Sequence, residues 1–313
     1  MPLTDRPWLP IAAVATTLVL WASAFVAIRH LGGTYSAGSL SLGRLVVGSI
    51  ALGAVAVSRG LPRPSGRDWL GLVVIGVLWF AVYNVALNQG EHHVDAGTSA
   101  MLIQVSPVLI AVLATLFLGE HFTLWLGVGL VLAFAGVVLI GVSQPGGHND
   151  IVGVLLCLLA ALVYSIALVV QKPLVSRLSA LHVTWLACTV GAIACLPFAG
   201  QLVDGTRDAS ASDVWWVVYL GLFPTAIAFT TYAFALQHMT ASSLGITTYL
   251  VPPLTILMGW VFLAETPPGM AYVGGALALV GVAVSRRRTA PRKVPETPDE
   301  LALETCSAEP EPR

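Results

Sequence analysis

The sequence predicts an all-α polytopic membrane protein with ten transmembrane helices, arranged as two inverted five-helix repeats. Three observations predict it: the composition, a regular series of apolar stretches and an internal duplication. Hydrophobic residues make up 57% of the 313 residues, charged residues only 10%, and the mean hydropathy is +0.85. A soluble domain of this length could not keep so much apolar surface out of water, so we expect the chain to lie in a lipid bilayer.

Charged and Pro/Gly-rich breaks divide the chain into ten apolar stretches, each close to the ~17–25 residues that a helix needs to cross the hydrocarbon core. The expected helices lie near residues 9–29, 37–58, 68–88, 96–118, 123–142, 151–171, 181–200, 213–236, 240–263 and 269–285. They predict a first repeat over 1–142 and a second over 143–288. Residues 289–313 are rich in Pro, Glu and Thr and are expected to form a disordered cytoplasmic tail.

The two halves share sequence at nearly constant offsets. The segment Leu116–Glu120 recurs as Val261–Glu265, 145 positions later, and Pro107 meets Pro252 at the same offset. Further matches are Trp21–Arg29 with Tyr164–Lys172 at an offset of 143, and Tyr83–Leu87 with Tyr232–Leu236 at 149. An odd number of helices in each repeat makes the second begin on the opposite side of the membrane, so the repeats are expected to be inverted.

Basic residues predict the orientation. If the N-terminus is cytoplasmic, twelve of the fifteen basic residues lie inside, namely Arg6, Arg59, Arg63, Arg67, Lys172, Arg177, Arg286, Arg287, Arg288, Arg292, Lys293 and Arg313. Short cytoplasmic loops carry such an excess of Lys and Arg. We therefore expect a multi-pass protein of the cell membrane with both termini cytoplasmic.

Pairs of equivalent residues predict a binding cavity near the middle of the membrane. Pro107 and Pro252 each remove a backbone donor and should bend their helices, which leaves carbonyl groups that need a partner or a water-lined space. Gln104 and Tyr249 lie three residues before these prolines. Simple helix packing and helix–helix hydrogen bonds remain alternative explanations for all four residues.

Other candidates for this cavity are aromatic or amide side chains. Trp21 and Tyr164 occupy equivalent positions inside the first helix of each repeat, and Tyr83, Asn84 and Tyr232 lie in the third helices. Aromatic rings at this depth could clamp an apolar substrate, although packing would also explain them.

Three charged residues are expected to have structural or gating roles. Arg44 is the one charge deep within a span, where the insertion cost is ~2.5–3.5 kcal/mol at a helix centre. It could anchor a substrate carboxylate or act as a gate, but we favour the interpretation that it reaches outward or bonds helix-end carbonyls to hold the second helix. Glu120 and Glu265 follow the fourth and ninth helices and should face the positive N-terminal ends of the next helices.

Catalytic, metal and cofactor sites are not indicated. Every acidic residue falls at a span end or in a loop, which disfavours a proton-driven exporter of cations but leaves other coupling open. The four cysteines lack a paired spacing, and the neighbours His92 and His93 lack a third ligand. No ATP-binding loop occurs, so we expect no cofactor.

The segment from Trp21 to Phe25, Arg44, and Ser106–Pro107 followed by Leu116–Glu120 together resemble the EamA-type carriers of the drug/metabolite transporter superfamily. The resemblance covers about residues 9–285. It implies export or facilitated movement of a small metabolite, often an amino acid or a related compound, through a cavity between the halves.

The leading hypothesis is thus a carrier that works by alternating access between its repeats. The alternatives are an intramembrane enzyme acting on a lipid-linked substrate, which would need catalytic groups that the spans lack, and a non-transporting scaffold or sensor. The expected partners are a small-molecule substrate and the lipid bilayer, without nucleic acid, in a monomer or homodimer.

The orientation can be tested by labelling. Single cysteines placed at 59–67 or 172–180 in a cysteine-free chain should be shielded from an impermeant thiol reagent in intact cells, because these loops carry the cytoplasmic charge. Single cysteines at 143–150 or 201–212 should react. Labelling of the 59–67 loop from outside would overturn the orientation.

Overall fold

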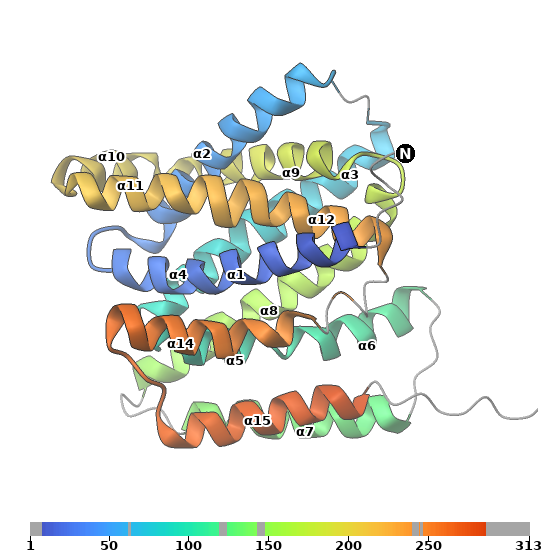
Figure 1. The fold of residues 1–313 in the computed structure, drawn as a ribbon, viewed down its shortest axis with the longest axis vertical. Coiled ribbons are helices and arrows are strands. Elements are labelled where there is room, and N and C mark those ends of the chain that lie inside the picture. The colour runs from blue at the N-terminus through green and yellow to red at the C-terminus, as the bar shows by residue number, and fades with distance from the viewer. Residues whose placement is uncertain are drawn as a thin grey trace, which may run out of the picture.

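The computed structural model describes residues 8–61, 64–118, 124–142, 148–239, 244 and 247–285, and the regular elements within them are all helical (Figure 1). The first half contains α1 (Trp8–Leu31), α2 (Ala37–Ser58), α3 (Gly66–Ile75), η2 (Gly76–Val82), α4 (Tyr83–Glu91), α5 (Ala96–Ile103), α6 (Ser106–Leu118) and α7 (Leu124–Val142). The second contains α8 (His148–Val175), α9 (Ala180–Ala194), η3 (Leu196–Phe198), α10 (Ala199–Asp208), α11 (Ala211–Leu220), η4 (Gly221–Ile227), α12 (Ala228–His238), η5 (Thr248–Leu250), α14 (Val251–Leu263) and α15 (Gly269–Ser285).

Five continuous helices among the described residues are long and apolar enough to cross a membrane: Trp8–Leu31, Ala37–Ser58, Gly66–Glu91, Ile151–Val175 and Ala211–His238. A sixth is possible if Ala180–Ala194 and Leu196–Asp208, which meet at a bend of 53°, count as one span. Shorter apolar helices follow in the regions of α5–α7, α14 and α15. The fold is that of a multi-pass membrane protein, while the ten-helix, two-repeat layout remains a prediction.

The structure corrects two of the expected helices. The helix expected at 181–200 ends at Ala194, and residues 201–208, expected as loop, belong to α10. Pro197 lies in the short η3 turn between them, where its missing N–H interrupts the helix. The helix expected at 96–118 is broken between Ile103 and Ser106, ahead of Pro107.

Each half contains a seven-residue π-helix in the middle of a long span. These are η2, which begins at Gly76, and η4, which begins at Gly221. A side chain bonds the carbonyl five residues earlier in both places: Asn84 Nδ2 lies 3.3 Å from Trp79 O, and Thr225 Oγ1 lies 2.8 Å from Leu220 O. These polar side chains satisfy carbonyl groups where the regular helical pattern changes.

Equivalent serines cap helices in the two halves. Ser36 caps α2 and Ser179 caps α9, and each side chain accepts a bond from the backbone N–H three residues later. Capping boxes formed by Ser65 with Asp68 and by Ser210 with Asp213 begin α3 and α11. The sequence thus places the same start signal at corresponding helices.

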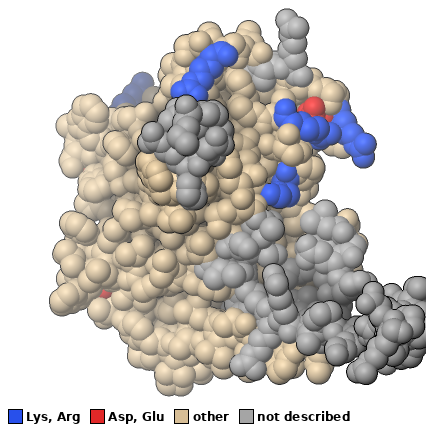
Figure 2. All heavy atoms as spheres, turned by 45° about the vertical axis from the view of Figure 1, so that its right-hand side comes forward, with Lys and Arg blue, Asp and Glu red and all other residues tan. Residues whose placement is uncertain are grey.

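The centre of the molecule is formed around α1, which packs against α12 and α14 and also contacts α4, α5 and η4. The last helices of the two halves, α7 and α15, pack side by side at one edge (Figure 1). On the face shown in Figure 2, Lys and Arg side chains gather in the upper part, and most of the other described surface is uncharged. One ion pair, Arg177 Nη2 to Asp68 Oδ1 at 2.7 Å, joins α3 to the chain after α8.

Close backbone contact between α9 and η2 gives a stability prediction. A Cβ atom added at Gly191 would overlap Phe80 Cβ and lie 3.0 Å from Gly76 O. Gly191→Ala should therefore lower the free energy of unfolding by ~1–3 kcal/mol, the usual cost of overpacking. Thermal unfolding in detergent would measure the loss.

The control is Gly200→Ala in α10, where an added Cβ would meet nothing within 4 Å. This change should be neutral or stabilising, since Ala favours a helix by up to ~1 kcal/mol over Gly. Equal effects of the two substitutions would contradict the packing argument.

Candidate functional site

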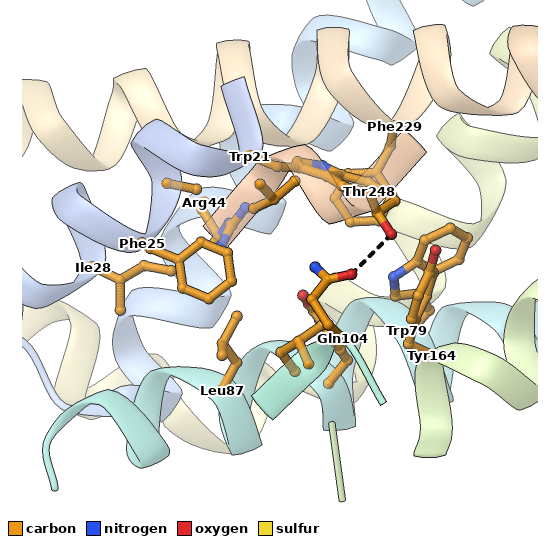
Figure 3. A pocket seen from close by; sticks show the side chains of 14 residues that line it. Trp21, Phe25, Ile28, Arg44, Trp79, Leu87, Gln104, Tyr164, Phe229 and Thr248 are labelled. Carbon is orange, nitrogen blue, oxygen red and sulfur yellow. Dashed lines mark hydrogen bonds between the residues drawn. The ribbon is translucent and has the colours of Figure 1, made fainter. Parts of the chain in front are cut away.

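A small cavity lies where α1, α2, η2, α4, α8 and α12 meet the broken helices α5–α6 and η5–α14 (Figure 3). It is lined by Trp21, Ala24, Phe25, Ile28, Arg44, Trp79, Tyr83, Leu87, Ile103, Gln104, Tyr164, Phe229, Thr248 and Val251. The volume open to the centres of water-sized spheres is about 40 Å³. One water needs ~10–15 Å³ on that measure, so the cavity has room for a few waters at most.

Arg44 is the single charged residue in this lining. Its side chain reaches the cavity from α2, is 3% exposed, and donates from Nε to Thr225 Oγ1 at 3.0 Å. Thr225 can accept this bond because its own hydroxyl hydrogen is directed to Leu220 O within η4. The π-helix therefore holds the acceptor that keeps the guanidinium in place.

Aromatic rings form much of the cavity wall. Trp21 lies 4.7 Å from Tyr232 and 5.5 Å from Phe229 between ring centroids. Trp79 lies 4.9 Å from Tyr164, whose hydroxyl group is 2.6 Å from that of Tyr232. These contacts join α1, η2, α8 and α12 in one cluster, with tilted and edge-to-face geometries that favour aromatic association.

The break between α5 and α6 brings an amide into the cavity. Pro107 has no N–H to donate to Ile103 O, and Ser106 Oγ donates to that carbonyl instead at 2.5 Å. Gln104 sits at the break, and its Oε1 accepts from Thr248 Oγ1 at 3.2 Å (Figure 3). This hydrogen bond links the broken helices of the two halves.

Trp21 contributes a donor to the cavity that has no partner among the described residues. Trp21 Nε1 is buried and makes no hydrogen bond within them. A buried donor without an acceptor is costly, and functional sites are a common reason for one. The indole N–H is therefore available to a bound molecule.

The structure brings together Trp21, Tyr83, Gln104 and Tyr164 of the predicted cavity residues, with Tyr232 directly behind Tyr164. Asn84 does not line the cavity, because its amide bonds Trp79 O and Phe80 O on its own span. Thr248 takes the position expected for Tyr249, since neighbouring residues of the η5 turn face different directions. Pro107 and Pro252 also lie outside the lining, at the starts of α6 and α14.

Arg44 and Glu265 make contacts that the sequence analysis did not predict. Arg44 faces the cavity rather than reaching outward. Glu265 pairs with Arg29, whose Nε lies 3.1 Å from Oε1 and 3.2 Å from Oε2. Glu120 lies outside the described residues.

Three aromatic residues of the wall, Phe25, Trp79 and Phe229, were not predicted as cavity residues by the sequence analysis. Phe229 carries a usable signal, because Phe80 and Phe229 are equivalent at the offset of 149 that relates Tyr83 to Tyr232. Their rings lie 4.7 Å apart. Trp79 has no aromatic equivalent at this offset, so only the fold places it in the wall.

Comparison with known proteins gives a family match in both halves. A model of the EamA-like transporter family matches residues 8–142 and 151–287. The chain is 38% identical over 294 residues to the "Probable terminal-alkyne amino-acid exporter" of Streptantibioticus cattleyicolor, covering 94% of this chain and 97% of that protein. It is 33% identical over 265 residues to "Uncharacterized transporter YdfC" of Bacillus subtilis, covering 84% and 86%.

A solved structure also resembles the chain. A protein crystal structure superposes with a TM-score of 0.63, covering 88% of this chain and 97% of its own. The sequence identity is 20%, so this likeness shows the fold alone.

The Arg44–Thr225 contact yields a prediction. Thr225→Val keeps the side-chain shape but leaves a buried guanidinium N–H without its acceptor, which should cost ~1–3 kcal/mol of unfolding free energy. Thr225→Ser keeps the hydroxyl and should retain most of the stability. Thermal unfolding would separate the two variants, and equal stability would show that the contact contributes nothing.

Proposed function

This chain belongs to the EamA-like transporter family, and from that premise we propose that it carries a small organic carboxylate, such as an amino acid, across the cell membrane. The chain is a transporter and not an enzyme, as its family and the names of its relatives indicate. The observation that carries the substrate class is Arg44, a buried cation in a cavity whose described lining holds no acid.

A carboxylate is the ligand that best fits Arg44. The guanidinium has five N–H donors, and Nε is already directed to Thr225. The remaining donors can bind a carboxylate in the parallel arrangement that Arg favours. An anion here would also supply the negative charge that the described lining lacks.

The rest of the wall favours an apolar or aromatic substrate body. Aromatic side chains dominate it, and rings of this kind can also attract an ammonium group placed over their faces. Trp21 Nε1 and the Gln104 amide supply a few directed polar contacts. A free amino acid with an apolar side chain combines these features, which agrees with the amino-acid exporter named among the relatives.

The size of the cavity supports a cycle in which the site opens and closes. Ligand sites are typically ~300–1,000 Å³, far larger than the present cavity of about 40 Å³. We infer that the described conformation is a closed one and that the substrate enters when helices of the two halves move apart. The broken helices and the π-helices are the segments best suited to such movement, since their backbone pattern is already irregular.

The repeats and the direction of transport belong to the same proposal. Two five-helix repeats in inverted orientation would give the protein equivalent arrangements of helices towards the two faces of the membrane, so that one site could open to either side. Matching helix caps and matching π-helices in the two halves support this layout. Export is favoured by the name of the relative that is 38% identical.

The substrate class can be tested by binding to purified protein. Apolar and aromatic amino acids and their carboxamides would be compared by thermal shift, where a ligand at 100 times its Kd stabilises by ~2.7 kcal/mol. At least one amino acid should stabilise the protein while its carboxamide does not. Arg44→Gln should weaken that binding by about 10- to 150-fold, the equivalent of ~1.5–3 kcal/mol for a bond to a charged group.

Arg59→Gln is the matched control, because Arg59 is an exposed residue at the C-terminal end of α2, outside the cavity lining. This variant should bind as the wild type does. Equal binding of an amino acid and its carboxamide to the wild-type protein would exclude Arg44 as a carboxylate anchor, whatever the stability of the Arg44 variant.

A further inference from the structure

Glu91, the last residue of α4, is buried without a hydrogen-bond partner. It is 2% exposed, and neither carboxyl oxygen has a partner among the described residues. An ionised carboxylate in such a place loses its hydration and gains no hydrogen bond or ion pair to replace it. The sequence places Glu91 at a helix end, but its burial becomes visible only in the fold.

A guanidinium lies next to Glu91 but is directed elsewhere. Arg29 Nη1 donates to the backbone carbonyl of Glu91 at 2.7 Å, while Arg29 Nε contacts both carboxylate oxygens of Glu265 at 3.1 and 3.2 Å. The Glu91 side chain forms no ion pair with Arg29. Arg29 thus contacts both acidic residues, and its side chain pairs with the carboxylate of Glu265, which belongs to the second half.

The surrounding charges do not compensate an ionised Glu91. Two cations, Arg29 and Arg44, and two acids, Asp95 and Glu265, act on it. The Asp95 carboxylate is fixed as the cap of α5 by Thr98. Since these two positive and two negative formal charges sum to zero, a charged Glu91 would give the group of five a net negative charge.

The titratable neighbours without a formal charge do not change this balance. They are Tyr83 on the same span, Cys157 on α8 and the adjacent His92. Partial burial, His93 and Arg29 together lower the pKa of His92, so its imidazole is neutral at pH 7. Among these neighbours, Arg29 and Arg44 are therefore the positive charges.

We propose that Glu91 is a proton-binding site coupled to the Arg29–Glu265 ion pair. In the described conformation Glu91 carries a proton and Glu265 holds Arg29. When the ion pair separates, the Glu91 carboxyl releases its proton to water and the resulting carboxylate takes the guanidinium, while Glu265 remains ionised and becomes hydrated. Proton binding at Glu91 and pairing of Glu91 with Arg29 exclude one another.

The second half has no equivalent of this site in its sequence. Lys172, which matches Arg29, donates to Leu236 O at 2.7 Å and to Met239 O at 2.9 Å, much as Arg29 donates to Glu91 O. The position equivalent to Glu91 at the offset of 149 is Thr240. The proton site is thus confined to one end of the molecule, so that it would make opening of the protein to one side of the membrane, and not to the other, depend on proton binding.

Distance measurements across the ion pair test the proposal without a substrate. Spin labels would be attached at Gly33→Cys, beyond the end of α1, and Thr266→Cys, next to Glu265, in a chain whose native cysteines are replaced by alanine. Both positions are exposed, and a Cβ at Gly33 meets nothing within 4 Å. Double electron–electron resonance in nanodiscs would follow the label–label distance as pH is raised.

The long-distance population should grow with pH, with a slope of at most about tenfold per pH unit for one proton. Glu91→Gln imitates the protonated side chain and should keep the short distance at every pH. Asp204→Asn, which removes an acid whose side chain is 77% exposed, should behave as the wild type does. A Glu91→Gln protein that retains the pH response, or a wild type without one, would overturn the proposal.

Infrared spectroscopy of the unlabelled wild-type protein gives an independent readout if Glu91→Gln does not fold. A protonated carboxyl group has a C=O stretch that shifts in D₂O, and the wild type should show this band at neutral pH and lose it as pH rises. Absence of the band at neutral pH would also overturn the proposal.

Discussion

The cavity depends on how the protein keeps a buried guanidinium in an apolar interior. Arg44 is 3% exposed, and the described lining of its cavity, which has room for a few waters at most, holds no acid to compensate the charge. A hydroxyl group takes this part: Thr225, held in place within the π-helix η4, accepts a hydrogen bond from Arg44 Nε. Under the proposed function, the remaining N–H groups of Arg44 would bind the carboxylate of a substrate whose apolar body lies against the aromatic wall of the cavity.

Irregular helices are the means by which the fold brings polar groups to this place. A regular helix uses its N–H and C=O groups internally and offers little to a ligand, whereas a break frees them. At the α5–α6 break, Ser106 Oγ donates to Ile103 O, to which Pro107 has no N–H to donate. Gln104 lies at this break, and its side-chain oxygen accepts a hydrogen bond from Thr248. In the π-helices, Asn84 and Thr225 bond the carbonyls five residues before them. The same irregular segments are those we expect to move when the site opens.

Much of the helical order could be predicted because it depends on local sequence. Apolar length and the charged or Pro/Gly-rich breaks located most of the described helices to within a few residues, apart from α10 and the α5–α6 break, and the repeat pointed to Trp21, Gln104 and Tyr164. The cavity residues that the sequence analysis assigned differently have a common explanation. Which face of a helix meets the cavity depends on packing and on local rotation, so Thr248 replaced Tyr249 and Asn84 turned to its own backbone. The burial of Glu91, the position of Trp79 and the pairing of Arg29 with Glu265 depend on contacts between distant segments, which one sequence does not reveal.

The central claim is that one closed cavity opens alternately to the two sides of the membrane. Counterflow in proteoliposomes tests it most directly, with the purified protein and a panel of radiolabelled apolar and aromatic amino acids as probes. Vesicles preloaded with an unlabelled member of the panel should take up the same labelled compound transiently above equilibrium, because the loaded carrier exchanges faster than the empty one returns. Simple equilibration without overshoot for every member of the panel, from a folded protein, would contradict the account.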